Sequence, residues 1–134
     1  MRLTERIERL TSRLLDRLTR VRIHDVRRRL AEEPSTVTDE DLDFLAMEVG
    51  WRAYLAPDDI TGEEWAVWVR RRGAAWDWEP EEIEEAARCM STMPGNDRLR
   101  LVRSITANAE ADGHTRESVM REREAWQRRI FAPG

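Results

Sequence analysis

The sequence of 134 residues carries 23 basic and 27 acidic side chains, a formal net charge of −4, and one cysteine. A single cysteine excludes an intrachain disulfide and a four-cysteine zinc site. The sequence contains no run of about 18 apolar residues, the length needed to span a membrane. The N-terminus has no apolar signal core. We therefore expect a cytoplasmic, all-α protein that folds as one compact domain, residues 1–134, with about six helices.

The first predicted helix runs from about Thr4 to Leu30 and is strongly basic. Apolar residues recur at steps of three and four and form one stripe, made of Leu3, Ile7, Leu10, Leu14, Leu18 and Val21. Residues 1–30 hold ten arginines against four acidic residues, a net charge of +6. At roughly 40 Å the helix is too long for an ordinary domain core, so we expect it to protrude, break or pair with a second copy. The stripe is interrupted by Arg17, His24 and Asp25, so a sustained coiled coil is not our first expectation.

The second predicted helix covers residues 38–55 and is apolar on two faces, which is typical of a central, buried helix. It begins with a capping pair, Thr38 and Asp41. We place it at the centre of a core formed by residues 38–131.

Four shorter helices are predicted after it. The third covers residues 61–73, opens with a Thr-x-x-Glu capping box, and ends at Gly73, where a C-capping glycine is expected. Pro80 suits the first turn of the fourth helix. The fifth and sixth helices are expected at residues 97–110 and 115–130, where apolar residues again follow the helical period.

Two short acidic loops, residues 58–63 and 112–117, have almost the same sequence and lie 54 residues apart. Both fit Asp-[Asp/Gly]-x-Thr-x-Glu and precede a predicted helix. Their oxygen atoms suit calcium or magnesium, and a histidine shifts the preference toward zinc. The candidate metal ligands are Asp58, Asp59, Glu63, Asp112, His114 and Glu117. The alternative is that the same residue types only cap helix N-termini.

The repeated unit of helix, acidic loop and helix resembles the TerB-like (tellurite-resistance) helical module over residues 40–130. The matching stretches are residues 55–64 and 109–117. The resemblance implies an all-helical cytoplasmic module with an internal pseudo-repeat and an accessory role in stress or defence systems. It also implies a cation-binding acidic surface formed by Asp58, Asp59, Glu63, Asp112 and Glu117.

Tryptophan is abundant, and five of the six indoles fall between residues 51 and 78. We expect Trp51, Trp65 and Trp68, which lie on predicted helices, to pack in the core. The linker between the third and fourth helices carries two more, and we predict a partner surface made of Trp76, Trp78, Arg70 and Arg71. Stacking on nucleotide bases is an alternative, although residues 31–97 carry a net charge of −13.

Three functions remain open at this stage. The first is a non-catalytic interaction module that binds a divalent cation at the paired loops. The second is an adaptor or assembly subunit whose Arg-rich first helix binds itself, an acidic protein or RNA, with RNA disfavoured by the net acidity. The third is a magnesium-dependent nucleotide hydrolase, because Glu82 and Glu85 share a helix face as in the MazG-type pyrophosphohydrolases. Cys89 is expected to be a buried structural thiol.

Overall fold

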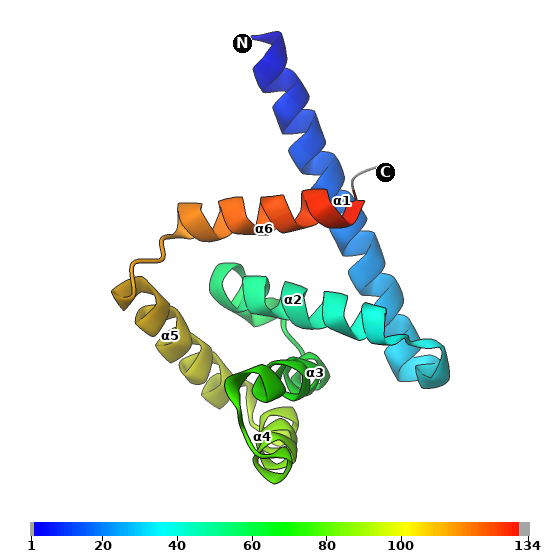
Figure 1. Ribbon diagram of the computed structural model, residues 1–134, viewed down its shortest axis with the longest axis vertical. Helices are drawn as coiled ribbons and strands as arrows, with labels where there is room; N and C mark the ends of the chain where they lie inside the picture. Colours follow the sequence, from blue (N-terminus) through cyan, green and yellow to red (C-terminus); the bar gives the residue numbers. More distant parts are fainter. Residues whose placement is uncertain (1, 132–134) are drawn as a thin grey trace. The chain divides into compact units, whose positions relative to one another are not determined.

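The computed structural model describes residues 2–131, apart from the side chain of Ile105. Within these residues it contains six α-helices and no strand, which confirms the predicted fold class and number of helices (Figure 1). The bounds are Leu3–Glu32 for α1, Asp39–Leu55 for α2, Gly62–Gly73 for α3, Pro80–Thr92 for α4, Gly95–Ala111 for α5 and Arg116–Phe131 for α6.

The chain divides into two compact units, and each is described by itself. One contains residues 1–37 with residues 120–134, and the other contains residues 38–119. The division differs from the expected core of residues 38–131, because α6 from Met120 onward groups with α1 instead of with α2.

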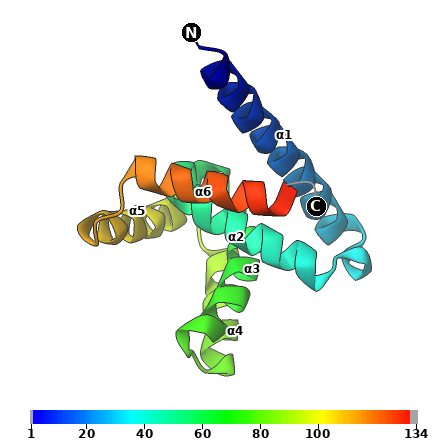
Figure 2. The same cartoon turned by 45° about the horizontal axis from the view of Figure 1, so that its top comes forward.

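In the first unit, α6 crosses α1 (Figures 1 and 2). Polar side chains fix the crossing. Arg123 Nη1 and Gln127 Nε2 both donate to Asp16 Oδ1, at 2.9 and 3.0 Å. The buried Gln127 amide also lies 3.0 Å from Thr19 Oγ1. The buried face of α1 consists of Leu15, Thr19, Ile23 and Val26. The N-terminal turns of α1 extend beyond the crossing, so α6 does not cover them.

In the second unit, α2 packs against α3 and α5. Its buried apolar side chains are Phe44, Leu45, Ala46, Val49 and Ala53. The predicted cap is confirmed, because the Asp41 N–H donates to Thr38 Oγ1 and the Thr38 N–H donates to Asp41 Oδ2, both at 3.1 Å. Helix α3 packs in turn on α4 through a small apolar cluster centred on Ala66, Val69 and Ala87.

The prediction that Gly73 is a C-cap was wrong. Gly73 is buried and helical, with φ −57° and ψ −39°. A Cβ atom there would lie 2.8 Å from Ile83 Cγ1, so the missing side chain lets α3 approach α4 closely. The left-handed residue that turns the chain between these helices is Asp77, with φ 59°.

Candidate functional sites

The first acidic loop follows α2 as a short 3-10 turn, Pro57–Asp59, and then opens α3. The predicted capping box is confirmed at this helix start. The Glu64 N–H donates to Thr61 Oγ1, and the Thr61 N–H donates to Glu64 Oε1, both at 3.2 Å. Two backbone donors at the start of α3 are thereby satisfied by the side chains of Thr61 and Glu64.

A buried charge network holds this loop against α2. Arg52 pairs through Nη2 with Glu64 Oε2, and its Nε lies 3.9 Å from Glu48 Oε1. Its Nη1 donates to the backbone carbonyl of Asp59 at 3.1 Å. Both glutamates are buried, so one guanidinium ties together α2, the loop and the capping residue of α3. No sequence pattern pointed to this network, because its members lie up to 16 residues apart.

The second acidic loop has a different backbone path. The His114 N–H donates to the Ala109 carbonyl at 3.1 Å and the Gly113 N–H donates to the Glu110 carbonyl at 3.0 Å, which is a Schellman C-cap of α5. Gly113 has φ 95°, which favours glycine. Thr115 and Ser118 then form a reciprocal cap of α6, with N–H to Oγ distances of 2.9 and 3.1 Å. The two loops therefore share their helix-starting threonine but not the turn before it.

The six predicted metal ligands are exposed and lie on two separate stretches of chain. The first loop lies beside the start of α5, where Asp58 and Arg98 line one cavity of about 210 Å³. The second loop follows the other end of this 17-residue helix, roughly 25 Å away. Between residues 2 and 131, no group of three or more His, Cys, Asp or Glu side chains could hold a metal ion. Cation binding gains no support from this arrangement and stays a prediction.

Four tryptophans form a row that leads from the core of the second unit to its surface. The ring centroids of Trp65 and Trp68 lie 5.2 Å apart, those of Trp68 and Trp76 5.3 Å, and those of Trp76 and Trp78 5.4 Å. Trp65 is buried as predicted, whereas Trp76 and Trp78 are 42% and 40% exposed. The turn at Asp77 therefore presents two adjacent indoles to solvent.

The arginines predicted to share this surface are paired with carboxylates. Arg70 Nε and Nη2 donate to the two oxygens of Glu84 at 3.1 and 3.3 Å. Arg71 Nη2 lies 2.8 Å from Asp39 Oδ1, and its Nε lies 3.6 Å from Asp43 Oδ1. Because both guanidinium groups already have anionic partners, nothing here favours the base-stacking alternative, which needs them at phosphates. The partner surface at Trp76 and Trp78 stays a prediction.

The carboxylates proposed for a hydrolase lie on the exposed side of α4. Arg88 Nη2 donates to both oxygens of Glu85 at 2.6 and 2.7 Å and holds the pKa of that carboxyl below its usual value. The expectation of a buried Cys89 was wrong, because its thiol is exposed. Cys89 stands two residues after the buried Ala87, on the opposite side of the helix at about 100° per residue.

An unpartnered apolar surface of the first unit lies on α1. Six side chains, which we call the apolar seam, are 37–73% exposed: Leu3, Ile7, Leu10, Leu14, Leu18 and Val21. Every residue from Arg2 to Leu10 is exposed. Helix α1 thus has two apolar faces, and only the face that contains Leu15 is buried. None of the helices in the described part of the chain combines the length and apolarity needed to cross a membrane.

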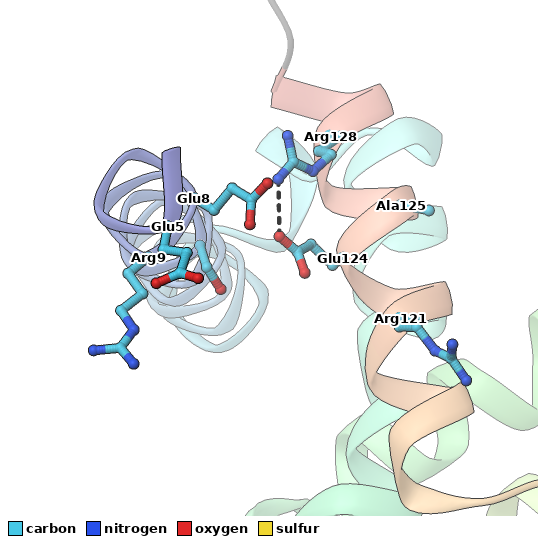
Figure 3. A pocket seen from close by; sticks show the side chains of 8 residues that line it. Glu5, Glu8, Arg9, Arg121, Glu124, Ala125 and Arg128 are labelled. Atoms are coloured by element: carbon cyan, nitrogen blue, oxygen red, sulfur yellow. Dashed lines mark hydrogen bonds and ion pairs between the residues drawn. The ribbon is translucent and has the colours of Figure 1, made fainter. Parts of the chain in front are cut away.

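An open cleft of about 530 Å³ lies between α1 and α6 of the same unit. Figure 3 shows Glu8 reaching from α1 toward α6, while Arg9 and Arg121 point away from the gap. Arg128 Nη2 pairs with Glu124 Oε1 at 3.0 Å across one turn of α6. Small-molecule pockets are mostly apolar with a few polar groups, whereas six of the eight side chains that line this cleft are charged.

Comparisons with family models, with curated proteins and with solved structures find no match to this chain. The resemblance to the TerB-like module therefore stays a prediction that rests on the two loop sequences.

Proposed function

We propose that this chain is a non-catalytic interaction module that binds another helix along the apolar seam of α1. The observation that carries the proposal is the exposure of six apolar side chains at helical spacing, in a helix whose opposite face is buried. Contiguous apolar patches of more than a few hundred Å² on a folded surface mark interaction sites. The seam extends over five turns of α1, so its side chains form a ridge that can pack into the groove between side chains of a second helix.

The shape of the seam favours a helical partner. On a helical wheel of about 100° per residue, its six residues fall within an arc of about 80°. Helices that face a domain core or lie in a bilayer surface have broader apolar faces, whereas a stripe of this width is the seam of a helix pair. The three-and-four spacing supplies side chains that insert between those of a second helix.

The energetic gain from covering the seam is moderate. Full burial of a Leu, Ile or Val side chain contributes roughly 1.5–3 kcal/mol, so covering the exposed half of six contributes on the order of 5–10 kcal/mol. Association costs about 4–15 kcal/mol in lost translational and rotational freedom. Apolar contact alone therefore gives weak binding, and the side chains that flank the seam decide how tight the complex is.

A synthetic three-heptad helical peptide tests the proposal. It carries Ile at a, Leu at d and Gln at every e and g position, and its binding to the full chain is followed by fluorescence anisotropy. We expect saturable binding that weakens at least tenfold in the Leu10→Gln, Leu14→Gln variant, with folding unchanged because both residues are exposed. The control is Met120→Gln, which replaces an exposed apolar residue outside the seam. Binding that is absent, or equal in both variants, would reject the proposal.

A further inference from the structure

The charges beside the seam all have the same sign. In heptad terms, Ile7, Leu14 and Val21 occupy a, and Leu3, Leu10 and Arg17 occupy d. The g positions along the seam are Arg6, Arg13 and Arg20, and the e positions are Thr4, Thr11 and Leu18. The seam is thus bordered by arginine on one side and by uncharged residues on the other.

Among the residues that the structure describes, these arginines have no anionic partner. Within the described residues, no hydrogen bond or ion pair involves the side chain of Arg6, Arg13, Arg17 or Arg20. Most arginines of α3 and α4 behave differently, as the pairs Arg70–Glu84 and Arg88–Glu85 show. The acidic residues in the N-terminal turns of α1, Glu5 and Glu8, line the cleft that faces α6 instead of the seam (Figure 3).

Building on the proposed function, we infer that the partner of the seam is an acidic amphipathic helix of another protein. Carboxylates at the e and g positions of such a helix would meet Arg6, Arg13 and Arg20 beside the apolar contact, where partial desolvation strengthens the pairing. The same pairing would speed association through long-range attraction.

A second copy of the chain fits less well. In a parallel pair of α1 helices, Arg17 at d would face its own copy across the seam. In an antiparallel pair, the g positions of the two helices face each other, so the Arg6–Arg13–Arg20 row would meet an identical row. Both arrangements place like charges together. In the parallel pair only Arg20 would meet a carboxylate, that of Asp25 five positions on in the partner helix. Asp25 already pairs with Arg28 and Arg29.

The inference is tested with three peptides that share Ile at a and Leu at d and differ only at e and g, which are all Glu, all Gln or all Lys. We expect the Glu peptide to bind at least tenfold more tightly than the Gln peptide and the Lys peptide to bind least, with the difference shrinking as salt rises. Neutralising the arginine row with Arg6→Gln, Arg13→Gln and Arg20→Gln should abolish the preference for Glu and leave binding of the Gln peptide unchanged.

A matched control removes three exposed arginines outside α1, through Arg100→Gln, Arg103→Gln and Arg129→Gln. This variant has the same net charge as the row variant, and it should keep the preference for the Glu peptide. If it loses the preference equally, overall charge explains the effect and the inference is overturned. Equal binding of all three peptides also overturns the inference but leaves the proposed function standing, whereas binding of none rejects both.

Two further measurements distinguish the competing partners. Light scattering of the full chain without peptide should give the monomer mass at micromolar concentration. A seam-dependent dimer, lost in the Leu10→Gln, Leu14→Gln variant, would assign the seam to a second copy. Tighter binding to phosphatidylserine vesicles than to the Glu peptide would assign it to an anionic membrane surface. Either result contradicts the inference.

Discussion

Replacing Arg52 by methionine should destabilise the second unit strongly. The substitution keeps the volume of the aliphatic stem but removes the guanidinium that pairs with the buried carboxylates of Glu48 and Glu64. Removing one partner of a buried ion pair costs about 3–5 kcal/mol, out of a total stability of about 5–15 kcal/mol. At about 4 °C per kcal/mol for a chain of this size, Tm should fall by more than about 10 °C.

Urea unfolding followed by tryptophan fluorescence measures this loss, because five of the six indoles lie in residues 51–78. The control is Arg128→Met, which breaks an exposed pair with Glu124 and should change the free energy of unfolding by less than about 0.5 kcal/mol. Adding Glu64→Gln to Arg52→Met should restore at least about 1 kcal/mol, because the amide oxygen still accepts from the Thr61 N–H. A loss for Arg52→Met no larger than that for Arg128→Met would refute the reasoning.

Two further predictions concern packing and ionisation. Gly73→Ala should lower the free energy of unfolding by about 1 kcal/mol, because overpacking against Ile83 costs about 1–3 kcal/mol and the gain in helix propensity is only about 1 kcal/mol. The control is Gly95→Ala, whose Cβ would meet nothing closer than 3.9 Å and which should show no loss in the same urea assay. Tyr54, the only tyrosine, should titrate above 10.0 by near-ultraviolet absorbance, because partial burial and the nearby Glu110 carboxylate raise its pKa. Its contribution to stability is therefore present below pH 10 and lost as the pH rises through the folded pKa. Glu110→Gln should lower the pH midpoint of the Tyr54 titration. A midpoint at or below 10.0 in the unsubstituted chain would contradict the proposed effect of burial and of Glu110 on Tyr54.

The helices and their starts could be predicted because the interactions that set them are local. Thr38 and Thr61 cap N–H groups three residues away, and Pro80 occupies the first turn of α4 as expected. The prediction for Gly73 was wrong because a glycine at a helix end can serve either as a left-handed C-cap or as a point of close approach to another helix. Only the position of Ile83 on the next helix shows that close packing, not a left-handed turn, requires it.

The use of each face of α1 could not be predicted from spacing. Leu15, Thr19, Ile23 and Val26 also step by four and three, so the sequence contains a second stripe, which is the buried one. The crossing by α6 depends on pairs such as Asp16–Arg123, which are 107 residues apart. Such contacts leave no periodic signal in the sequence.

The chemistry of the acidic loops could not be predicted from the sequence either. Asp, Thr and Glu are at once helix-capping residues and oxygen ligands, and the sequence alone does not decide between these uses. In the structure, Thr61 and Thr115 cap their helices, and the turns before them differ. Both threonines of the 54-residue repeat therefore serve as helix caps, whereas a shared cation-binding role of the two loops stays a prediction.

Two neighbouring leucines of α1 test the central claim most directly. Leu14 lies in the seam and is 56% exposed, whereas Leu15 lies on the buried face and is 6% exposed. Leu15→Ala should lower the free energy of unfolding by about 2–5 kcal/mol, and Leu14→Ala should change it by less than about 0.5 kcal/mol while weakening binding of the Glu peptide several-fold. Equal destabilisation by both substitutions, or full peptide binding by Leu14→Ala, would show that the seam is not a docking surface.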